Sequence, residues 1–195
     1  MIAYLKGKFT NITPSSVIVD VQGVGYEISI SLNTYTDIQH QQEGMLFTHL
    51  IIKEDAHLLY GFSNTTEKDI FLLLISVSGI GANTARLILS YMKPEEVSHA
   101  ILNGDARALE RIKGIGKKTA ERTVLELKDK VGKQSAHSIS PSPIAASHAI
   151  EQDALEALLA LGINRQQASQ QVSRMLKAEP GLVLEDLIKK VLKEL

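Results

Sequence analysis

The sequence predicts a multidomain α+β protein: an N-terminal OB-like β-barrel, a tandem helix-hairpin-helix α domain, and a C-terminal three-helix domain on a flexible linker. Three observations support this prediction. Short β-branched segments fill the first third of the chain, and the apolar spacing becomes helical near residue 66. Residues 134–150 then hold five serines and two prolines but no charge. The 195 residues suffice for more than one domain.

Residues 1–63 have the pattern of a small β-barrel. Gly23 and Gly25 mark a turn between two β-branched segments. Five strands are enough for an OB-like barrel, although the strand count alone leaves an SH3-like barrel open. The expected strands are 2–10, 17–21, 26–30, 47–52 and 57–62.

Residues 64–133 have the apolar spacing of helices, divided by several glycines and one proline. Thr66 is expected to cap the first of these helices, because Asp69 follows three residues later. One face of that helix is lined by Ile70, Leu73, Leu74 and Val77.

Residues 134–152 are predicted to be a flexible linker, because their serine and proline content is typical of linkers. Residues 153–195 resume the helical spacing and are predicted to form three short helices. Gly162 is expected to end the first of them, and Asn164 is expected to cap the second.

The strongest functional signal is an internal repeat at a spacing of 35 residues. Residues 77–85 align with residues 112–120, and both copies contain Gly-Ile-Gly followed, after two residues, by Thr-Ala. Each copy lies between two helical stretches, which is the helix-hairpin-helix pattern of proteins that bind the DNA backbone. A single Gly-x-Gly is often only a turn between helices, but two copies in register favour the DNA-binding interpretation.

Each residue type in the repeat has a physical reason. The two glycines of each copy permit a positive φ and leave no side chain between the backbone amides and a phosphate. The isoleucine between them is expected to pack into the core, and the following helix presents its unpaired N–H groups and positive dipole end to an anion. The candidate DNA-binding residues are Gly79, Ile80, Gly81, Asn83, Gly114, Ile115, Gly116, Lys117, Lys118, Thr119 and Arg122.

The charge of the chain is segregated. Its net charge is only −1, but residues 111–133 hold eight basic against three acidic side chains, a local charge of +5. Such a patch favours binding to phosphates even when the total charge is near zero. Contacts of this kind reach the DNA backbone and not the base edges, so little sequence specificity is expected.

Other function classes find less support. The chain has no cysteine and no P-loop, and its six histidines lack metal-ligand spacing, so no catalytic residue, metal or cofactor is predicted. A helix-hairpin-helix nuclease or glycosylase is the alternative from the enzyme class, which a catalytic carboxylate cluster or a Lys–Asp pair in a cleft would favour. A single-strand-binding barrel is disfavoured by 5% aromatic residues and no tryptophan. No apolar run is long enough for a membrane span and no secretory signal is found, so a cytoplasmic location is expected.

Several motifs give the chain a resemblance to a known family. The sequence contains Gly-Val-Gly-Tyr-Glu at 23–27, Lys-Glu-Asp-Ala at 53–56, Leu-Tyr-Gly-Phe at 59–62, and both hairpins, of which the stretch 114–122 is the most specific. Across essentially its whole length the chain resembles the RuvA family, the DNA-binding subunits of the bacterial Holliday-junction branch-migration complex. The resemblance implies a homotetramer or octamer that binds four-way junction DNA, and partners that include the hexameric ATPase RuvB and a junction resolvase.

The resemblance also implies roles for two further groups of residues. Glu54 and Asp55, which on their own are typical solvated turn residues, match an acidic pin at the centre of the family's four-fold assembly. The C-terminal domain of the family binds the motor, and by match to its pattern Leu158, Leu161 and Leu192 are candidates for that contact, with a core position left open for each.

Overall fold

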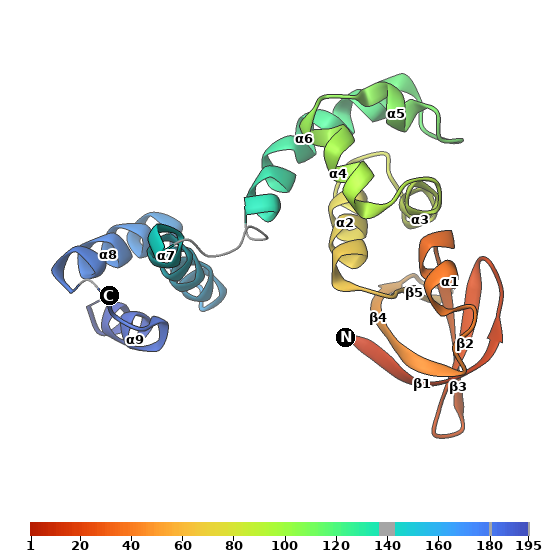
Figure 1. The fold of residues 1–195 in the computed structure, drawn as a ribbon, viewed down its shortest axis with the longest axis horizontal. Coiled ribbons are helices and arrows are strands. Elements are labelled where there is room, and N and C mark those ends of the chain that lie inside the picture. Colours follow the sequence, from red (N-terminus) through yellow and green to blue (C-terminus); the bar gives the residue numbers. More distant parts are fainter. Residues whose placement is uncertain (137–142, 180, 195) are drawn as a thin grey trace. The chain divides into compact units, whose positions relative to one another are not determined.

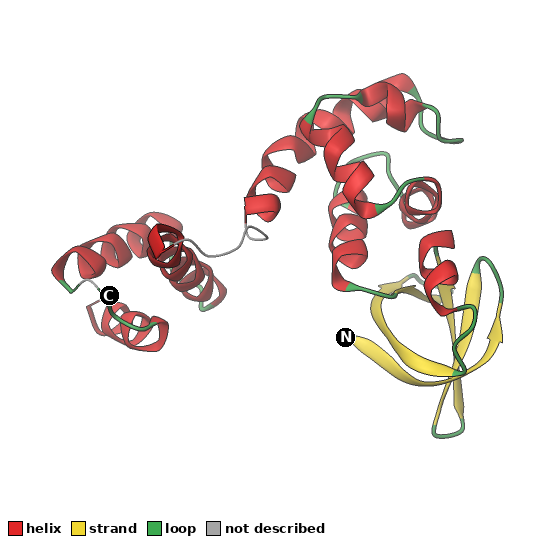
Figure 2. Cartoon of the chain, in the orientation of Figure 1, coloured by secondary structure: helices red, strands yellow, loops and turns green. Residues whose placement is uncertain are grey.

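The computed structural model describes residues 1–136, 143–179 and 181–194. Met1–Gln134 form one compact unit and Ser135–Leu195 form a second (Figure 1). The strands of the described chain all lie in the first unit, and Figure 2 shows them gathered in a barrel with helices beyond it.

The barrel has the strand order β1-β2-β3-β5-β4 and is closed by pairing between β1 and β4. Its strands are β1 (Tyr4–Ile12), β2 (Ser16–Val21), β3 (Val24–Ile30), β4 (Glu43–Ile52) and β5 (His57–Phe62). Only the β3–β5 pair is parallel. This five-stranded Greek-key closure confirms the OB-like barrel, which the strand count alone did not separate from an SH3-like one.

The barrel core follows from the alternation of side chains along each strand, because successive residues point to opposite faces. The inward positions carry branched apolar residues that are at most 1% exposed: Val17, Val19, Ile28, Ile30 and Leu46. A short helix that the sequence pattern did not predict, α1 (Leu32–Ile38), follows β3 and is capped by Ser31, whose side chain accepts from the Thr34 N–H.

The helical part of the first unit comprises α2 (Thr65–Ile75), α3 (Ala82–Tyr91), α4 (Pro94–Leu102), α5 (Ala106–Glu110) and α6 (Lys117–Ala136). The prediction that Thr66 caps α2 is wrong. Asn64 is the cap, with its side chain accepting from the Glu67 N–H at 2.8 Å, because the chain is still extended at residue 64 and is already helical at Thr65.

Besides the barrel's own core, strand β5 shares a second apolar core with the helices. Phe71 of α2 is fully buried and packs against Tyr60 and Phe62 of β5, with ring centroids 5.2 and 4.9 Å apart. Figure 1 shows α1 between the barrel and α3, where Asn33 donates to the Leu89 carbonyl at 2.6 Å. The helices that carry the hairpins are therefore held against the barrel by packing and not only by the chain connection.

A buried carboxyl group lies at this junction. Glu67 is 1% exposed and accepts hydrogen bonds from the hydroxyls of Ser31 and Thr34, the second at 2.6 Å. Burial raises the pKa of Glu67 above its ordinary value; the two hydroxyl donors act against this shift and the nearby Asp37 adds to it. The hydroxyl pair satisfies a polar group that would otherwise destabilise the core.

The second unit contains α7 (Pro143–Ala160), α8 (Arg165–Ala178) and α9 (Leu184–Glu194). Asn164 caps α8 as predicted, accepting from the Gln166 N–H at 2.9 Å. The core of this unit consists of Ala154, Leu158, Ala168, Val172, Met175, Leu187 and Val191.

The helix bounds around the expected linker differ from the prediction. Helix α6 continues to Ala136, and α7 begins at Pro143, ten residues earlier than residue 153. Proline is favoured at the first position of a helix, and the alanine-rich sequence after it supports helix formation. Residues 137–142, the centre of the predicted linker, lie outside the described residues.

Candidate nucleic-acid interface

The two hairpins have the same backbone geometry at the 35-residue spacing. The Ile80 N–H donates to the Val77 carbonyl at 3.1 Å, and the Ile115 N–H donates to the Ile112 carbonyl at 3.0 Å. Both isoleucines are only 5% exposed, as expected for side chains that anchor the hairpin in the core. The sequence repeat is therefore a structural repeat.

The glycines of each hairpin differ in their roles. Gly79 and Gly114 have φ of +96° and +94°, a conformation that favours glycine. The expectation of a positive φ at both glycines of a copy is wrong for the second one: Gly81 has φ −84°, and Gly116 is not among the positive-φ glycines. The second glycine begins a helix, where the backbone turns back to negative φ.

The second glycines have open space around them. A Cβ built on Gly81 or on Gly116 meets no other atom of the described structure within 4 Å. Neither the backbone angle nor the packing of the chain therefore requires glycine at these two positions. Glycine is favoured at the position before a helix, and the open space also leaves room for an external group to approach the backbone.

Each second glycine is followed by a helix whose first N–H groups have no hydrogen-bond acceptor within the helix. The first bonds of α3 and α6 are from the Ala85 N–H to the Gly81 carbonyl at 2.9 Å and from the Ala120 N–H to the Gly116 carbonyl at 3.0 Å. The amides before these bonds lack intrahelical acceptors, and they carry the positive end of the helix dipole. Each hairpin is therefore followed by a helix end of the kind that suits an anion.

The second hairpin adds charge to its helix end. Lys117 and Lys118 occupy the first two positions of α6, and both are exposed. Thr119 is half-buried, with its hydroxyl close to the first hairpin. In the first hairpin the positions equivalent to the two lysines are the uncharged Ala82 and Asn83.

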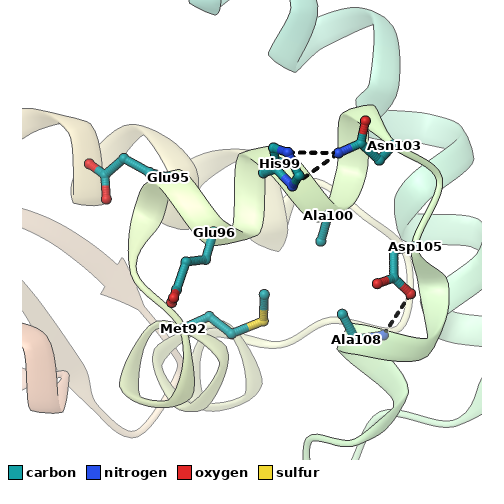
Figure 3. Close-up of a pocket in the computed structure, with 8 residues that line it drawn as sticks. All are labelled: Met92, Glu95, Glu96, His99, Ala100, Asn103, Asp105 and Ala108. Carbon is teal, nitrogen blue, oxygen red and sulfur yellow. Dashed lines mark hydrogen bonds between the residues drawn. The ribbon is translucent and has the colours of Figure 1, made fainter.

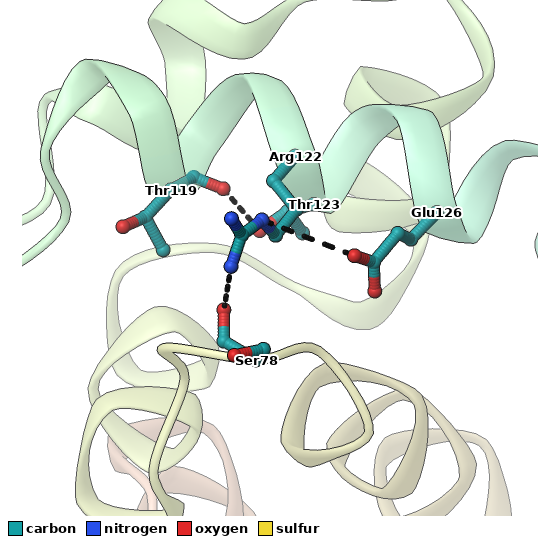
Figure 4. A network of polar contacts seen from close by, with 5 residues as sticks. All are labelled: Ser78, Thr119, Arg122, Thr123 and Glu126. Carbon is teal, nitrogen blue, oxygen red and sulfur yellow. Dashed lines mark hydrogen bonds and ion pairs between the residues drawn. The ribbon is translucent and has the colours of Figure 1, made fainter.

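The two hairpins lie next to each other. A Cβ on Gly79 would stand 3.8 Å from both Thr119 Cγ2 and Thr119 Oγ1. Arg122 spans the same gap: its Nη1 donates to the Ser78 carbonyl at 3.3 Å, and its Nε lies 3.9 Å from Glu126 Oε1 (Figure 4). Arg122 thus contacts the first hairpin from the helix of the second, and it remains half-exposed, at 53%.

Asn83 is exposed, but its side chain makes a hydrogen bond within the protein. Its Oδ1 accepts a hydrogen bond from the Tyr60 hydroxyl at 3.1 Å. Arg86, one turn further along α3, donates from Nη1 to the Ser15 carbonyl at 2.9 Å. Tyr60 and Arg86 were missed in the sequence analysis, because their hydrogen-bond partners are 23 and 71 residues away. The available signal was that the second copy of the repeat has lysine at the position of Asn83.

The two acidic candidates occupy the tip of the β4–β5 hairpin. The Lys53 N–H donates to the Ala56 carbonyl at 2.8 Å and closes the turn, which leaves Glu54 and Asp55 exposed. Both carboxylates therefore project from the barrel into solvent.

A separate hollow of about 480 Å³ lies on α4 and α5 (Figure 3). Two of its carboxylates serve the local backbone: Glu96 accepts from the Lys93 N–H at 2.8 Å, and Asp105 accepts from the Ala108 N–H at 3.2 Å. Its acidic lining disfavours phosphate, so it does not extend the hairpin surface. The lining residues are Met92, Glu95, Glu96, His99, Ala100, Asn103, Asp105 and Ala108.

The three candidate leucines of the second unit have different environments. Leu158 is fully buried in the core of this unit, the alternative that the sequence left open for it. Leu161 is 61% exposed and Leu192 is 42% exposed. Helix α7 ends at Ala160, and Leu161 lies just beyond the packed part of the helix.

The described residues contain neither a cluster suited to a metal ion nor a helix suited to a membrane. Among the residues that the structure describes, no group of three or more His, Asp or Glu side chains could hold a metal ion. In the same part of the chain, no helix is long and apolar enough to span a bilayer.

The fold and the site define a class: a tandem helix-hairpin-helix protein with an N-terminal OB-like barrel. Family models agree with this class along the chain. The model described as RuvA N terminal domain matches residues 1–61, the SAM-like helix-hairpin-helix tandem matches 71–129, and the RuvA C-terminal domain matches 149–195.

Full-length relatives give the family. The chain is 46% identical over 195 residues to a protein of Flavobacterium psychrophilum, 44% identical over 195 residues to one of Christiangramia forsetii, and 42% identical over 201 residues to one of Bacteroides thetaiotaomicron. In each case 100% of both chains is covered, and each relative is named Holliday junction branch migration complex subunit RuvA. The chain belongs to the RuvA family.

Proposed function

We propose that this chain is a non-catalytic subunit that binds four-way junction DNA without sequence specificity, holds it open, and recruits an ATP-driven motor for branch migration in recombination and repair. The observation that carries the proposal is the pair of adjacent hairpins, each with a glycine that has open space around it and a helix end that suits a phosphate. Full-length relatives named as RuvA support the same function.

The parts of the chain have separate roles in this proposal. Residues 1–63 supply oligomerisation and the acidic pin, 64–133 bind the DNA backbone, 134–152 act as a linker, and 153–195 bind a RuvB-type hexameric ATPase through surface leucines. The exposure of Leu161 and Leu192 supports the last role.

A homotetramer, or two tetramers forming an octamer, suits a junction with four arms. Four copies of Glu54 and Asp55 would bring eight carboxylates near the crossover, where they repel phosphates and keep the arms apart. Such a subunit acts on chromosomal DNA and therefore in the bacterial cytoplasm, where a junction resolvase is a further partner.

The nuclease or glycosylase alternative has no supporting observation. In the described chain no cluster of three acidic or histidine side chains could hold a metal, and the acidic hollow uses two of its carboxylates as backbone acceptors. No relative named above is called a nuclease.

Junction DNA is expected to bind at least about tenfold more tightly than linear duplex of equal length, a difference of about 1.4 kcal/mol. Only the junction offers four phosphate backbones around an open centre. An assembly that contacts about 6–10 phosphates loses roughly 10³–10⁵ in affinity between 50 and 200 mM salt. Competition gel shifts at both salt concentrations test this, and equal affinity for the two DNAs would refute the junction function.

Glu54→Gln combined with Asp55→Asn is expected to bind junctions as tightly as the wild type or more tightly, and to lose most of its discrimination against duplex. The amides are nearly isosteric with the carboxylates, and the turn is closed by backbone atoms of Lys53 and Ala56, so the tip should keep its shape while the repulsion disappears. The measurement is the ratio of junction to duplex affinity. An unchanged ratio would mean that the tip does not act as a pin.

A further inference from the structure

The first hairpin is tied to the barrel by polar side chains that the second hairpin lacks. The Tyr60 hydroxyl of β5 donates to Asn83 Oδ1 at 3.1 Å. Arg86 Nη1 donates to two barrel carbonyls, those of Ser15 at 2.9 Å and Ile30 at 3.3 Å. Asn83 and Arg86 are three residues apart on α3 and therefore share one face of the helix.

Tyr60 is a rigid member of this contact. It is 3% exposed and packs against Phe71, so its ring has little freedom to move. Burial raises the pKa of the Tyr60 hydroxyl above its ordinary value of 10, although the nearby Arg86 charge acts in the opposite direction. The hydroxyl therefore stays protonated at neutral pH and remains a donor to Asn83.

The contact connects the two electrostatic elements of the proposed site. Tyr60 lies five residues after Asp55 on β5, the strand that leaves the acidic tip. Asn83 lies in the first turn of α3, directly after the hairpin glycines Gly79 and Gly81. One hydrogen bond thus joins the strand that follows the acidic tip to the helix end that is proposed to attract phosphate.

The repeat shows that these residues are particular to the first hairpin. At the 35-residue spacing, Asn83 corresponds to Lys118 and Arg86 corresponds to Glu121. Lys118 is exposed and belongs to a lysine pair at the start of α6. The two copies keep the same backbone geometry but differ at the positions that, in the first copy, hold the barrel.

We propose that Asn83 and Arg86 are positioning residues for the first hairpin. Together with Tyr60 they fix the distance between this hairpin, which attracts phosphates, and the acidic tip, which repels them. Junction DNA is selected over duplex because only the junction fits this fixed distance. This inference rests on the proposed function. It changes the role of Asn83: its side chain holds the barrel, while its backbone N–H remains part of the helix end that faces DNA. The second hairpin supplies most of the charge-dependent affinity.

The test uses the full-length chain with Tyr60→Phe, Asn83→Ala and the double variant. Each single change is expected to lower the ratio of junction to duplex affinity by about three- to tenfold, because one hydrogen bond is lost. The double variant is expected to match the single ones, since both changes remove the same bond. The slope of affinity against salt should stay at its wild-type value, because no phosphate contact is removed.

Lys118→Ala is the matched control at the equivalent position of the second hairpin. It should reduce the salt slope by about one and weaken binding to both DNAs alike. Arg86→Lys keeps the charge but replaces the guanidinium, whose Nη1 donates to both carbonyls, by a shorter ammonium side chain, so it should repeat the loss of selectivity at an unchanged slope. Thermal unfolding of every variant gives the fraction of folded protein, and both affinities are corrected for that fraction.

Two results would overturn the inference. One is an unchanged affinity ratio in Tyr60→Phe and Asn83→Ala. The other is a reduced salt slope in Asn83→Ala while Tyr60→Phe keeps the wild-type affinities and slope. That result would make Asn83 a phosphate contact like Lys118. A wild-type chain without junction preference is a distinguishable outcome: it would refute the proposed function, and this inference with it.

Discussion

A chain cut after residue 136 is expected to lose motor-driven branch migration completely while keeping junction affinity within about threefold of the full-length value. Residues Met1–Gln134 form a compact unit with their own cores, and the cut keeps all of α6. Both hairpins and the +5 patch of 111–133 remain in the fragment, whereas residues 151–195 carry a net charge of only −1. Gel shifts with a four-way junction and ATP-dependent strand separation with added RuvB-type motor measure the two activities.

A point variant separates the motor contact from the loss of a whole unit. Leu161→Ser with Leu192→Ser changes two exposed side chains of the second unit, which should stay folded because neither belongs to its core. It should reproduce the migration defect with normal junction binding. Migration at the wild-type rate in the truncated chain would show that residues 137–195 do not contact the motor, and loss of junction binding would show that the DNA-binding unit extends past residue 136.

Most of the fold could be predicted from local sequence patterns. The strands and the hairpins follow from period-two alternation, β-branched segments and a repeated glycine motif, all of which are visible within a dozen residues. The short helix Leu32–Ile38 was missed because seven residues give too little periodicity, and its stability comes from contacts such as Asn33 to the Leu89 carbonyl, 56 residues away. Short elements of this kind depend on tertiary packing.

The exposure of the C-terminal leucines could not be predicted from helical periodicity alone. Leu158 and Leu161 are three residues apart, so a continuous helix would place them on similar faces. The helix ends at Ala160, and only Leu158 remains in the packed core. The sequence indicated Gly162 as the stop, but burial changes within the last turn, where helix ends are hardest to predict.

The hairpin residues could be predicted from the repeat, but their partners could not. Arg122 was expected to contact DNA because it is basic and close to the second hairpin. In the structure it also donates to the Ser78 carbonyl of the first hairpin, 44 residues away. Contacts across such separations depend on how α6 packs beside the first hairpin, which no local pattern encodes.

Gly116→Ala is expected to weaken junction binding by about 10- to 100-fold while changing the free energy of unfolding by less than about 1 kcal/mol. The fold accepts alanine there: residue 116 is not among the positive-φ positions, and the added Cβ meets nothing within 4 Å. Alanine restricts the unfolded chain and so stabilises the protein by about 0.4–1 kcal/mol, but glycine is favoured over alanine at the position before a helix, and the two effects oppose each other. On DNA, the same methyl group stands between the amides at the start of α6 and a phosphate. Losing one hydrogen bond to a charged group costs about 1.5–3 kcal/mol, which gives the expected range.

Gly104→Ala is the matched control, because it should give the opposite pair of results. Gly104 lies outside both hairpins and also has open space around it, but its φ is +76°. Alanine is strained there and should cost about 1–2 kcal/mol of stability, while junction binding by the folded protein stays normal. Thermal unfolding and junction titration of both variants therefore separate backbone strain from steric exclusion of phosphate. Normal junction binding by Gly116→Ala would mean that phosphate does not approach the start of α6 closely, and the second hairpin would then act through its lysines alone.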